Sequence, residues 1–282
     1  MTATTGVRRT ITPVRVIAVR PDHHLEIPDR LATEEPMEIR AAGPGQPARQ
    51  VTVTMRTPGH DFELAAGFLL TEGLIAGPAD VAAVKYCDVP PDEEQQFNIV
   101  TVELAHPYQP GPWHRGFAVN SSCGVCGKVA LDQIEIRCPP VSSSLVVPAS
   151  LIPTLPQRLG QAQPVFAQTG GLHAAALFLP DGRLEALRED VGRHNAVDKI
   201  IGRGVLQHLL PLERCVLMVS GRVSFEIVQK AAMAGVPIIA AVSAPSSLAV
   251  EAADRLRVTL AGFVRAGTFN LYTWHDRIDL GG

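Results

Sequence analysis

The chain has 282 residues, of which 46% are hydrophobic and 19% charged, and its formal net charge is −3. This length can bury a large core, as one domain or as a domain with a smaller appendage. The charge argues against a nucleic-acid-binding protein, because phosphate contacts require a basic surface. No apolar run is long enough to span a bilayer.

The first ten residues carry Arg8 and Arg9, and no apolar block follows them, so the sequence predicts no secretory signal. We therefore expect a cytoplasmic protein with neither a membrane nor a nucleic-acid partner. The five cysteines are an odd set spread over a large chain. A reducing compartment disfavours structural disulfides, so a Cys-x-x-Cys pair there indicates metal binding or catalysis.

The N-terminal half predicts a β-rich α+β part. Alternation of apolar and polar residues predicts strands, and the apolar spacing from Phe62 to Leu69 predicts a helix that ends at Gly73. The expected strands are residues 14–20, 37–41, 50–56 and 97–104, with a short one at 117–119. We divide this half into a tail with the first strand, 1–35, and a smaller subdomain, 36–137.

The C-terminal half, residues 138–282, reads differently. A Pro- and Ser-rich connector leads to a predicted hairpin and then to alternating helices and fully apolar strands, which indicates a mixed sheet covered by helices. We predict an α/β fold, a three-layer sandwich. The expected hairpin is 172–178 and 183–187, the helices are 196–210, 224–234 and about 248–256, and the strands are 215–219, 237–242, 258–263 and 269–274.

The thiols Cys123 and Cys126 are each followed by a glycine, and Lys128 comes directly after the second. Glycines let the backbone approach a partner closely, so this segment reads as a loop that presents sulfur. Four uses remain open: a redox pair, a metal site, a sulfur carrier that forms a persulfide, or inert small residues. The glycines weaken a thioredoxin-like helix start. Zinc needs further ligands, and Cys87, Cys138, His173 and His194 stand at no familiar spacing.

A second group of polar residues runs from Glu189 to Lys199. It passes from a strand through Gly192 into a helix, with His194 or Asn195 as the expected N-cap. Free amides at a helix N-terminus together with Arg193 form an anion site, and His194 could exchange a proton. The plainer alternative makes Asp190 a turn former and Arg193 its surface partner.

Two crossover turns, residues 220–222 and 243–247, each follow an apolar strand and open a helix. Ligands of doubly wound sheets bind beyond the carboxyl ends of strands. With Arg193 and Arg265, these turns suggest a phosphate-bearing ligand of nucleotide size, although serine at such turns is also ordinary capping chemistry. The segment 262–270 offers a stacking surface and an anion contact, or an ordinary hairpin loop.

With these residues laid out, the sequence resembles the FdhD family, the sulfur-carrier accessory proteins required for active formate dehydrogenase. The matching motifs occur in the family's order, from about Glu35 to the C-terminus. They are MRTPGHD (55–61), GFLLTEG (67–73), CGVCG (123–127), GGLH (170–173), DVGRHNA (190–196), SGR (220–222), APSS (244–247) and the ending 262–273.

The resemblance implies that a cysteine desulfurase hands sulfur to Cys123 as a persulfide, with Cys126 assisting. It implies transfer to the molybdenum or tungsten cofactor, a bis-molybdopterin guanine dinucleotide, which then enters formate dehydrogenase. It also implies a cytidine-deaminase-like fold, a homodimer and pockets for guanine nucleotides such as GDP, with no resident metal site.

The position of the ending implies cofactor contacts in six consecutive residues: Phe263, Val264, Arg265, Ala266, Gly267 and Thr268. Our own inference adds guanine or phosphate contacts at five more positions: Asp190, Arg193, His194, Ser220 and Arg222.

Overall fold

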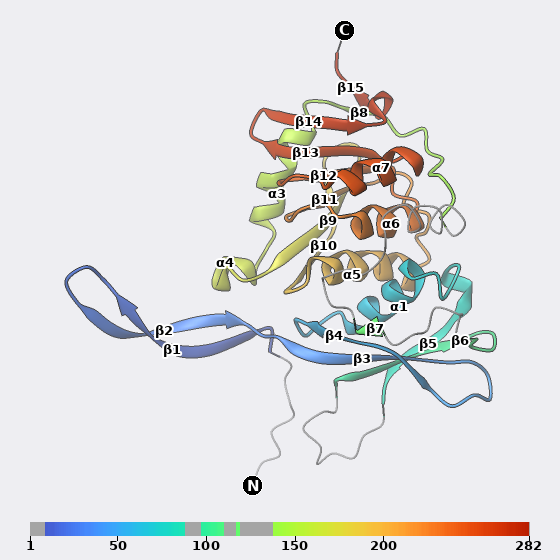
Figure 1. Ribbon diagram of the computed structural model, residues 1–282, viewed down its shortest axis with the longest axis horizontal. Coiled ribbons are helices and arrows are strands. Elements are labelled where there is room, and N and C mark those ends of the chain that lie inside the picture. The colour runs from blue at the N-terminus through green and yellow to red at the C-terminus, as the bar shows by residue number, and fades with distance from the viewer. Residues whose placement is uncertain (1–8, 88–96, 110–116, 119–137, 282) are drawn as a thin grey trace.

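The computed structural model describes residues 9–87, 97–109, 117–118 and 138–281. A six-stranded sheet with its helices forms the upper part in Figure 1, and a five-stranded sheet forms the lower part. A two-stranded arm projects to one side of the lower part. This is a mixed α/β fold with several sheets, as the sequence predicts.

The six-stranded sheet has the order β10-β9-β11-β12-β13-β14. Strands β11, β12 and β13 are parallel, and β9 and β14 run antiparallel to their neighbours. Because β10 is antiparallel to β9, it runs in the same direction as β11. Four strands therefore end at one edge of the sheet, here called the carboxyl edge. The strands are β9 (His173–Phe178), β10 (Leu184–Asp190), β11 (Val216–Val219), β12 (Ile238–Ala241), β13 (Thr259–Arg265) and β14 (Thr268–Thr273).

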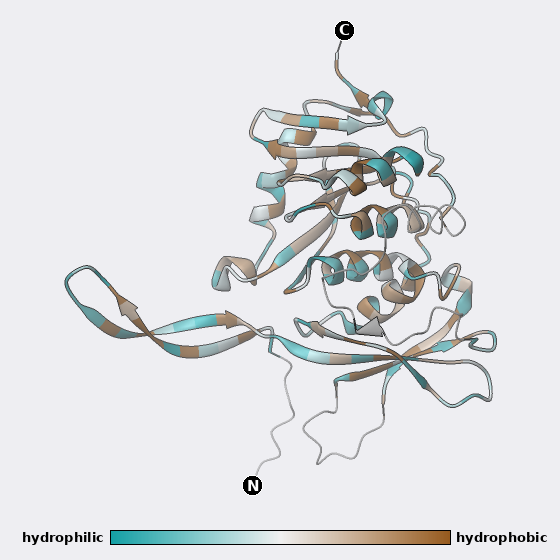
Figure 2. Ribbon diagram, viewed as in Figure 1, coloured by the Kyte–Doolittle hydropathy of each residue, from teal (hydrophilic) through white to brown (hydrophobic). Residues whose placement is uncertain are grey.

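Both faces of this sheet are covered. Leu217 and Val219 of β11 belong to the hydrophobic core under the helices α5 (Arg193–Leu206), α6 (Phe225–Met233) and α7 (Ser247–Arg255). Val216 and Met218 belong to a second core on the other face, under α3 (Leu155–Gln161). That core also takes in the 3-10 helix Ile152–Thr154 and the paired strands β8 (Val147–Pro148) and β15 (Ile278–Asp279). The hydropathy colouring shows the apolar residues concentrated along the sheet strands and the inner helices (Figure 2).

The lower sheet has the order β5-β6-β3-β4-β7. Helix α1 (Asp61–Thr71) lies between this sheet and α5 (Figure 1). Strands β3, β4 and β6 and helix α1 lie where the sequence predicts them, whereas β5 was not predicted, because its alanines blur the alternation. The strands are β3 (Glu35–Ala42), β4 (Arg49–Arg56), β5 (Val81–Tyr86), β6 (Ile99–Leu104) and β7 (Phe117–Ala118), and a 3-10 helix spans Pro78–Asp80.

The arm is an antiparallel hairpin of β1 (Ile11–Val19) and β2 (His24–Ala32). The sequence predicts only its first strand, since Pro28 and several charges obscure the second. One side of the arm carries Val14, Val16, Leu25 and Ile27, which face the same way because Val16 pairs with Ile27 and the other two lie two positions along their strands. Leu25 is 41% exposed. The base of the arm is held to the short helix α4 (Phe166–Thr169), where Arg30 donates a hydrogen bond of 2.6 Å to Gln168.

Helix α5 differs from its predicted limits at both ends. It begins at Arg193 with Gly192 as the N-cap, so the expected N-cap of His194 or Asn195 was wrong. It ends at Leu206 rather than at residue 210, because His208 adopts a left-handed φ of +55° and the N–H of Leu209 turns back to the carbonyl of Gly204. Helices α3 and α4 were not predicted, since both are short. A last 3-10 helix spans His275–Arg277. No helix in the described ranges is long and apolar enough to cross a membrane.

The two parts are joined where α1 crosses α5. A Cβ added to Gly67 would overlap the backbone carbonyl of Asp198, and one added to Gly202 would overlap the carbonyl of Glu63. The two helix backbones therefore approach as closely as glycine allows. Neither glycine can be replaced by a larger residue without separating the helices, because packed interiors leave no spare volume.

We expect Gly202→Ala to lower the free energy of unfolding by about 1–3 kcal/mol, since the overlap outweighs the better helix propensity of alanine. Gly160 in α3 is the matched control, because a Cβ there meets nothing within 4 Å. Gly160→Ala should stabilise by roughly 0.5–1 kcal/mol. Urea denaturation measures both, and equal effects of the two substitutions would contradict this account of the crossing.

Candidate functional site

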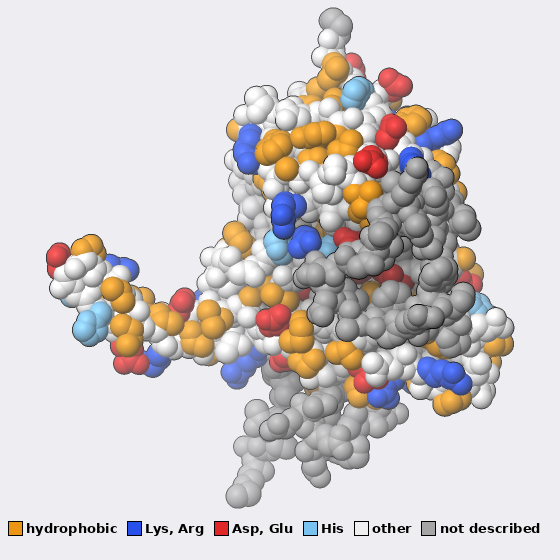
Figure 3. Space-filling view, in the orientation of Figure 1, with side chains coloured by type: hydrophobic (Ala, Val, Ile, Leu, Met, Phe, Trp, Pro, Cys, Tyr) orange, Lys and Arg blue, Asp and Glu red, His pale blue; other side chains and the backbone are white. Residues whose placement is uncertain are grey.

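The carboxyl edge brings together three of the segments that the sequence singles out. His173 begins β9, Arg193 begins α5, and residues 220–222 follow β11. A Cβ on Gly221 would lie 3.3 Å from His173 Nδ1 and 3.7 Å from Arg193 Cδ, so the three segments touch. Figure 3 shows basic and histidine side chains gathered at the corresponding ends of the strands. Burial, with the nearby charge of Arg193, lowers the pKa of His173.

Two arginines at this edge lack counter-ions among the residues that the structure describes. Within the described residues, Arg193 and Arg222 make no hydrogen bond or ion pair, and Arg193 Nε is buried without a partner. A buried guanidinium nitrogen without an acceptor is costly. An anion with several acceptor oxygens, such as a phosphate, would satisfy it. Ser220 is engaged differently, since its Oγ accepts a hydrogen bond of 2.9 Å from the backbone N–H of Ala174.

Asp190 lies beneath the edge rather than on it. It is 0% exposed and forms an ion pair of 2.6 Å with Lys199, which is 1% exposed. Its carboxylate also accepts hydrogen bonds from the backbone N–H of Thr57 and from Asn195 Nδ2. In this structure Asp190 holds the turn before α5 and does not reach a ligand on the surface.

The same network reaches β4. Lys199 Nζ donates to the carbonyl of Thr57 at 2.8 Å, and Asn195 Nδ2 donates to the carbonyl of Met55 at 2.7 Å. Thr54 Oγ1 donates to Asn195 Oδ1. The first turn of α5 is thus fastened to the end of β4 by groups more than 130 positions apart in sequence.

The ending of the chain forms a hairpin at the same edge. Phe263 is 44% exposed with φ +51°, and Gly267 turns the chain at φ +82°. Arg265 is exposed and donates to the carbonyl of Val242, and Ala266 and Thr268 are exposed at the tip. Val264 is 0% exposed, because the irregular register after Gly262 turns it into the core. It therefore does not face a ligand in this structure.

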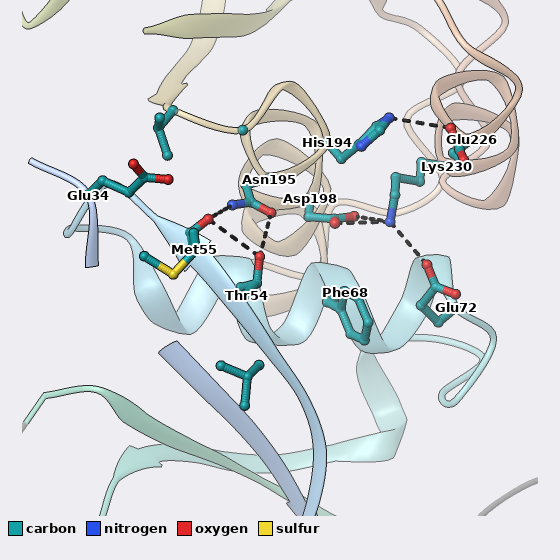
Figure 4. A pocket seen from close by; sticks show the side chains of 13 residues that line it. Glu34, Thr54, Met55, Phe68, Glu72, His194, Asn195, Asp198, Glu226 and Lys230 are labelled. Atoms are coloured by element: carbon teal, nitrogen blue, oxygen red, sulfur yellow. Dashed lines mark hydrogen bonds and ion pairs between the residues drawn. The ribbon is translucent and has the colours of Figure 1, made fainter. Parts of the chain in front are cut away.

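A cavity of about 480 Å³ lies on the other side of the α5 N-terminus, between the two parts of the chain. Such a volume suits a small ligand or an inserted side chain. Figure 4 shows His194, Glu226 and Lys230 close together on one side, with Glu34 and Met55 on the other. The lining residues are Glu34, Val53, Thr54, Met55, Phe68, Glu72, Val191, Gly192, His194, Asn195, Asp198, Glu226 and Lys230.

His194 and Glu226 form a polar pair in the cavity wall. Glu226 Oε2 lies 3.4 Å from His194 Nε2 and accepts a hydrogen bond of 2.7 Å from Ser224 Oγ. Ser224 Oγ in turn lies 3.2 Å from His194 Nε2. The hydrogen bond to His194 is the main cause that lowers the pKa of Glu226 to about 2. Glu226 is therefore a carboxylate at any physiological pH.

The cavity wall also holds a buried cation beside this pair. Lys230 Nζ lies 2.9 Å from Asp198 Oδ2, 2.9 Å from Thr71 Oγ1 and 3.3 Å from Glu72 Oε1. Burial raises the pKa of Asp198. Burial works to lower the pKa of Lys230, but attraction to Asp198 and Glu72 raises it on balance. The ammonium group of Lys230 thus finds its ionic and hydrogen-bonding partners within the protein, and this cluster forms part of the cavity wall.

Cys123 and Cys126 lie outside the described residues, so their predicted roles stay predictions. Two of the three described thiols are poor nucleophiles. Burial raises the pKa of the Cys138 thiol to about 12 and that of Cys215 to about 11, and Cys87 is half-buried. Among the described residues, no group of three His, Cys, Asp or Glu could hold a metal ion.

A model of the FdhD/NarQ family matches residues 32–279 of this chain. The chain belongs to this family. A relative from Mycolicibacterium paratuberculosis, named "Sulfur carrier protein FdhD", is 50% identical over 256 residues, which cover 89% of this chain and 92% of the relative. One from Streptomyces coelicolor with the same name is 47% identical over 280 residues, covering 94% and 95%.

A crystal structure of a Desulfotalea psychrophila protein, described as a formate dehydrogenase accessory protein, also resembles this FdhD/NarQ chain. Its TM-score is 0.75 at 25% identity, and the match covers 96% of this chain and all of that one. The family resemblance inferred from the sequence is therefore confirmed.

Sequence reasoning missed the cavity of this family member. Asp198, Glu226 and Lys230 were not singled out, because their meeting depends on the packing of α1, α5 and α6. One signal was present, since Lys230 falls on the apolar stripe of α6 beside Ile227 and Ala231. A charge in such a position indicates a buried partner.

We expect iodoacetamide at pH 8 to leave Cys138 and Cys215 unmodified in the folded protein, because their raised pKa values keep them as thiols. Peptide mass spectrometry would measure the alkylation of each cysteine. The denatured control is the same reaction in about 6 M guanidinium, a concentration that unfolds most domains. All five cysteines should react there. Alkylation of Cys138 in the folded protein at the denatured rate would contradict the burial described here.

Proposed function

We propose that this chain is a sulfur carrier that accepts sulfur from a cysteine desulfurase on Cys123 and delivers it for the activation of formate dehydrogenase. The observation that carries the proposal is the family membership, with relatives named as sulfur carriers over nearly their whole length. The Cys-x-x-Cys pair supplies the chemistry, because a thiolate can hold a sulfane sulfur as a persulfide.

The described thiols support the choice of Cys123 as the sulfur acceptor, because they are unsuited to that role. Cys138 and Cys215 are buried with raised pKa values, which suppress the thiolate that nucleophilic attack needs. Cys123 follows Ala118 of β7 by five residues in the sequence. A chain spans at most about 3.6 Å per residue, so this connection limits Cys123 to within roughly 18 Å of Ala118. Strand β7 pairs with Thr52 and Val53 of β4, beside the cavity.

The client substrate we propose is a bis-molybdopterin guanine dinucleotide cofactor. The carboxyl edge fits its phosphates, because Arg193 and Arg222 lack acceptors among the described residues and Arg193 Nε is buried and unpaired. The exposed ring of Phe263 could stack on guanine. We assign phosphate contacts to Arg193 and Arg222 and base contacts to the exposed residues of the 263–268 hairpin, without the buried Val264. Asp190 and Ser220 instead accept hydrogen bonds from the backbone N–H groups of Gly192 and Ala174, and so position the segments that carry the site.

Sulfur uptake needs no oxidant. The Cys123 thiolate attacks the terminal sulfur of the desulfurase persulfide, a new S–S bond forms on Cys123, and the donor cysteine leaves as a thiolate. Cys126 then attacks the inner sulfur of the Cys123 persulfide. This forms a disulfide and releases the terminal sulfur, as hydrosulfide, toward the client. We further propose a cytoplasmic homodimer of deaminase-like topology.

We expect mass spectrometry to show one added sulfur, about 32 Da, on the wild-type chain after incubation with desulfurase and cysteine. This follows from persulfide chemistry at a reactive thiolate. Cys123→Ala should remain unmodified and Cys126→Ala should still load. Equal loading of the wild type and Cys123→Ala would move the persulfide to Cys126.

The same purified protein separates the other uses of the thiol pair. Stoichiometric zinc that is lost with either Cys variant would favour a zinc-binding module. A defined two-electron midpoint with reduction by thioredoxin would favour a dithiol oxidoreductase. Either result without persulfide loading would contradict the sulfur-carrier proposal.

We expect Arg193→Gln to weaken GDP binding by about tenfold or more, because a charge-assisted hydrogen bond to phosphate contributes roughly 1.5–3 kcal/mol. Isothermal titration calorimetry measures the change. Arg20→Gln at the exposed tip of the arm is the control and should bind GDP as the wild type does. An unchanged affinity in Arg193→Gln would remove the phosphate site from this edge.

A further inference from the structure

His173 lies at the carboxyl edge, whereas His194, which the sequence expects there, lines the cavity. His173 is the first residue of β9, and β9 runs antiparallel to β11, so it begins where β11 ends. Side chains of a strand alternate between its two faces, and Ala175 and Leu177 of β9 belong to the core under α5 and α6. His173 therefore points to the side of the sheet on which α5 carries Arg193.

The turn after β11 is fastened directly beside this histidine. The N–H of Ser220 donates a hydrogen bond of 3.0 Å to the carbonyl of Ala174, and Ser220 Oγ accepts one of 2.9 Å from the N–H of Ala174. The next residue is Gly221, where a Cβ would lie 3.3 Å from His173 Nδ1 and 3.7 Å from Arg193 Cδ. The imidazole ring and the Arg193 side chain therefore meet over a residue that has no side chain of its own.

The basic groups of this cluster lack acceptors in the part of the chain that the structure describes. Arg193 Nε is buried without a hydrogen-bond partner, and neither ring nitrogen of His173 has one among the described residues. Arg222 is exposed in the same turn. Asp190 is the cross-strand neighbour of His173, but its carboxylate is engaged by Lys199 at 2.6 Å. The cluster therefore fits an anion with several acceptor oxygens.

We propose that His173 is a third phosphate contact at this edge, beside Arg193 and Arg222, and that it binds the phosphate as an imidazolium. This role rests on the phosphate site of the proposed function. In the free protein the ring is neutral at about pH 7, because burial and the charge of Arg193 lower its pKa below the ordinary value. A bound phosphate places negative charge beside the ring and raises that pKa again. The ring thus takes a proton from water when a diphosphate binds and returns it when the diphosphate leaves.

The neighbouring charges leave His173 neutral until the anion arrives. The charged and titratable groups on the elements around it are Arg193 and His194 of α5, Asp190 of β10, Glu226 of α6 and Arg222 after β11. Burial has the largest effect on its pKa, and Arg193 and His194 lower it further, whereas Asp190 raises it. Glu226 lies against His194, 3.4 Å from its Nε2. The charge that stabilises the imidazolium is therefore that of the ligand.

The test compares GDP binding by the wild type and His173→Gln across pH. Glutamine keeps a neutral hydrogen-bond donor but takes up no proton. Since only the wild type gains a proton at this position on binding, its affinity should rise relative to the variant as the pH falls. Calorimetry at about pH 8.5 should give similar affinities, and at about pH 6.5 the wild type should bind about tenfold more tightly. A ratio of affinities that stays constant with pH would overturn the proposal.

The matched control is His24→Gln on the exposed arm. It loses one imidazole, as His173→Gln does, and it should follow the wild-type profile at every pH. The same change of profile in His24→Gln would overturn the assignment to His173.

Proton uptake gives a second readout. Calorimetry in buffers of different ionisation enthalpy counts the protons exchanged on binding. The wild type should take up more protons than His173→Gln, by up to about one per nucleotide. Inorganic pyrophosphate lacks the base and guanosine lacks the phosphates. The difference between the two proteins should therefore persist with pyrophosphate and vanish with guanosine, and a difference that remains with guanosine would overturn the assignment to phosphate.

Gly221→Ala carries the test if His173→Gln fails to fold, which circular dichroism would show. The added methyl group would crowd His173 Nδ1 and the Arg193 side chain, so GDP should bind more weakly and with less proton uptake. Gly160→Ala is the control, because a Cβ there meets nothing within 4 Å. Equal proton uptake in the two glycine variants would contradict the proposed contact.

Failure of this role and failure of the proposed function give different results. If the wild type binds GDP and pyrophosphate and His173→Gln binds them with the same pH profile, only the role of His173 is lost. If the wild type binds neither, the phosphate site of the proposed function is lost with it. Persulfide loading of the wild type on Cys123 needs no GDP and tests the sulfur-carrier step separately.

Discussion

The close crossing of α1 and α5 is the constraint on which both candidate sites depend. Gly67 and Gly202 let the two helix backbones meet, and α5 carries Arg193 and His194 in its first turn. The crossing therefore decides how near β4 comes to the edge of the six-stranded sheet. The buried pair of Asp190 and Lys199 fixes the rotation of that turn, since both side chains are nearly unexposed. Removing one partner of such a pair costs about 3–5 kcal/mol.

In this arrangement the residues of the DVGRHNA motif face different parts of the structure. Asp190 and Asn195 point into the interior and tie the turn to β4, Arg193 reaches the carboxyl edge, and His194 reaches the cavity. A single helix start thus presents Arg193 to the carboxyl edge on one flank and His194 to the cavity on the other. The sequence compresses these roles into six adjacent positions, and only the packing shows that they face different ways.

Much of the α/β part could be predicted from the sequence, because its strands are wholly apolar and its turns are marked by glycine, serine and proline. The common edge for Arg193, Ser220 and Arg222 followed from the direction of parallel strands. The burial of Asp190 and Val264 did not follow, since it depends on Lys199 and on an irregular register after Gly262. The cavity was not predictable, because its walls come from segments that meet only through α1 and α5. Cys123 and Cys126 lie outside the described residues, so their assignment still depends on the sequence.

The arm has a consequence for how this chain avoids self-association through its backbone. Thr10 and Thr33, and likewise Arg20 and His23, form the inward hydrogen-bonded pairs of the hairpin. Pro13 and Pro28 pair with Arg30 and Arg15, in the alternate positions whose N–H groups would point outward. Each long outer rim of the ribbon therefore lacks a donor partway along it. A growing fibril cannot add strands continuously to such a rim.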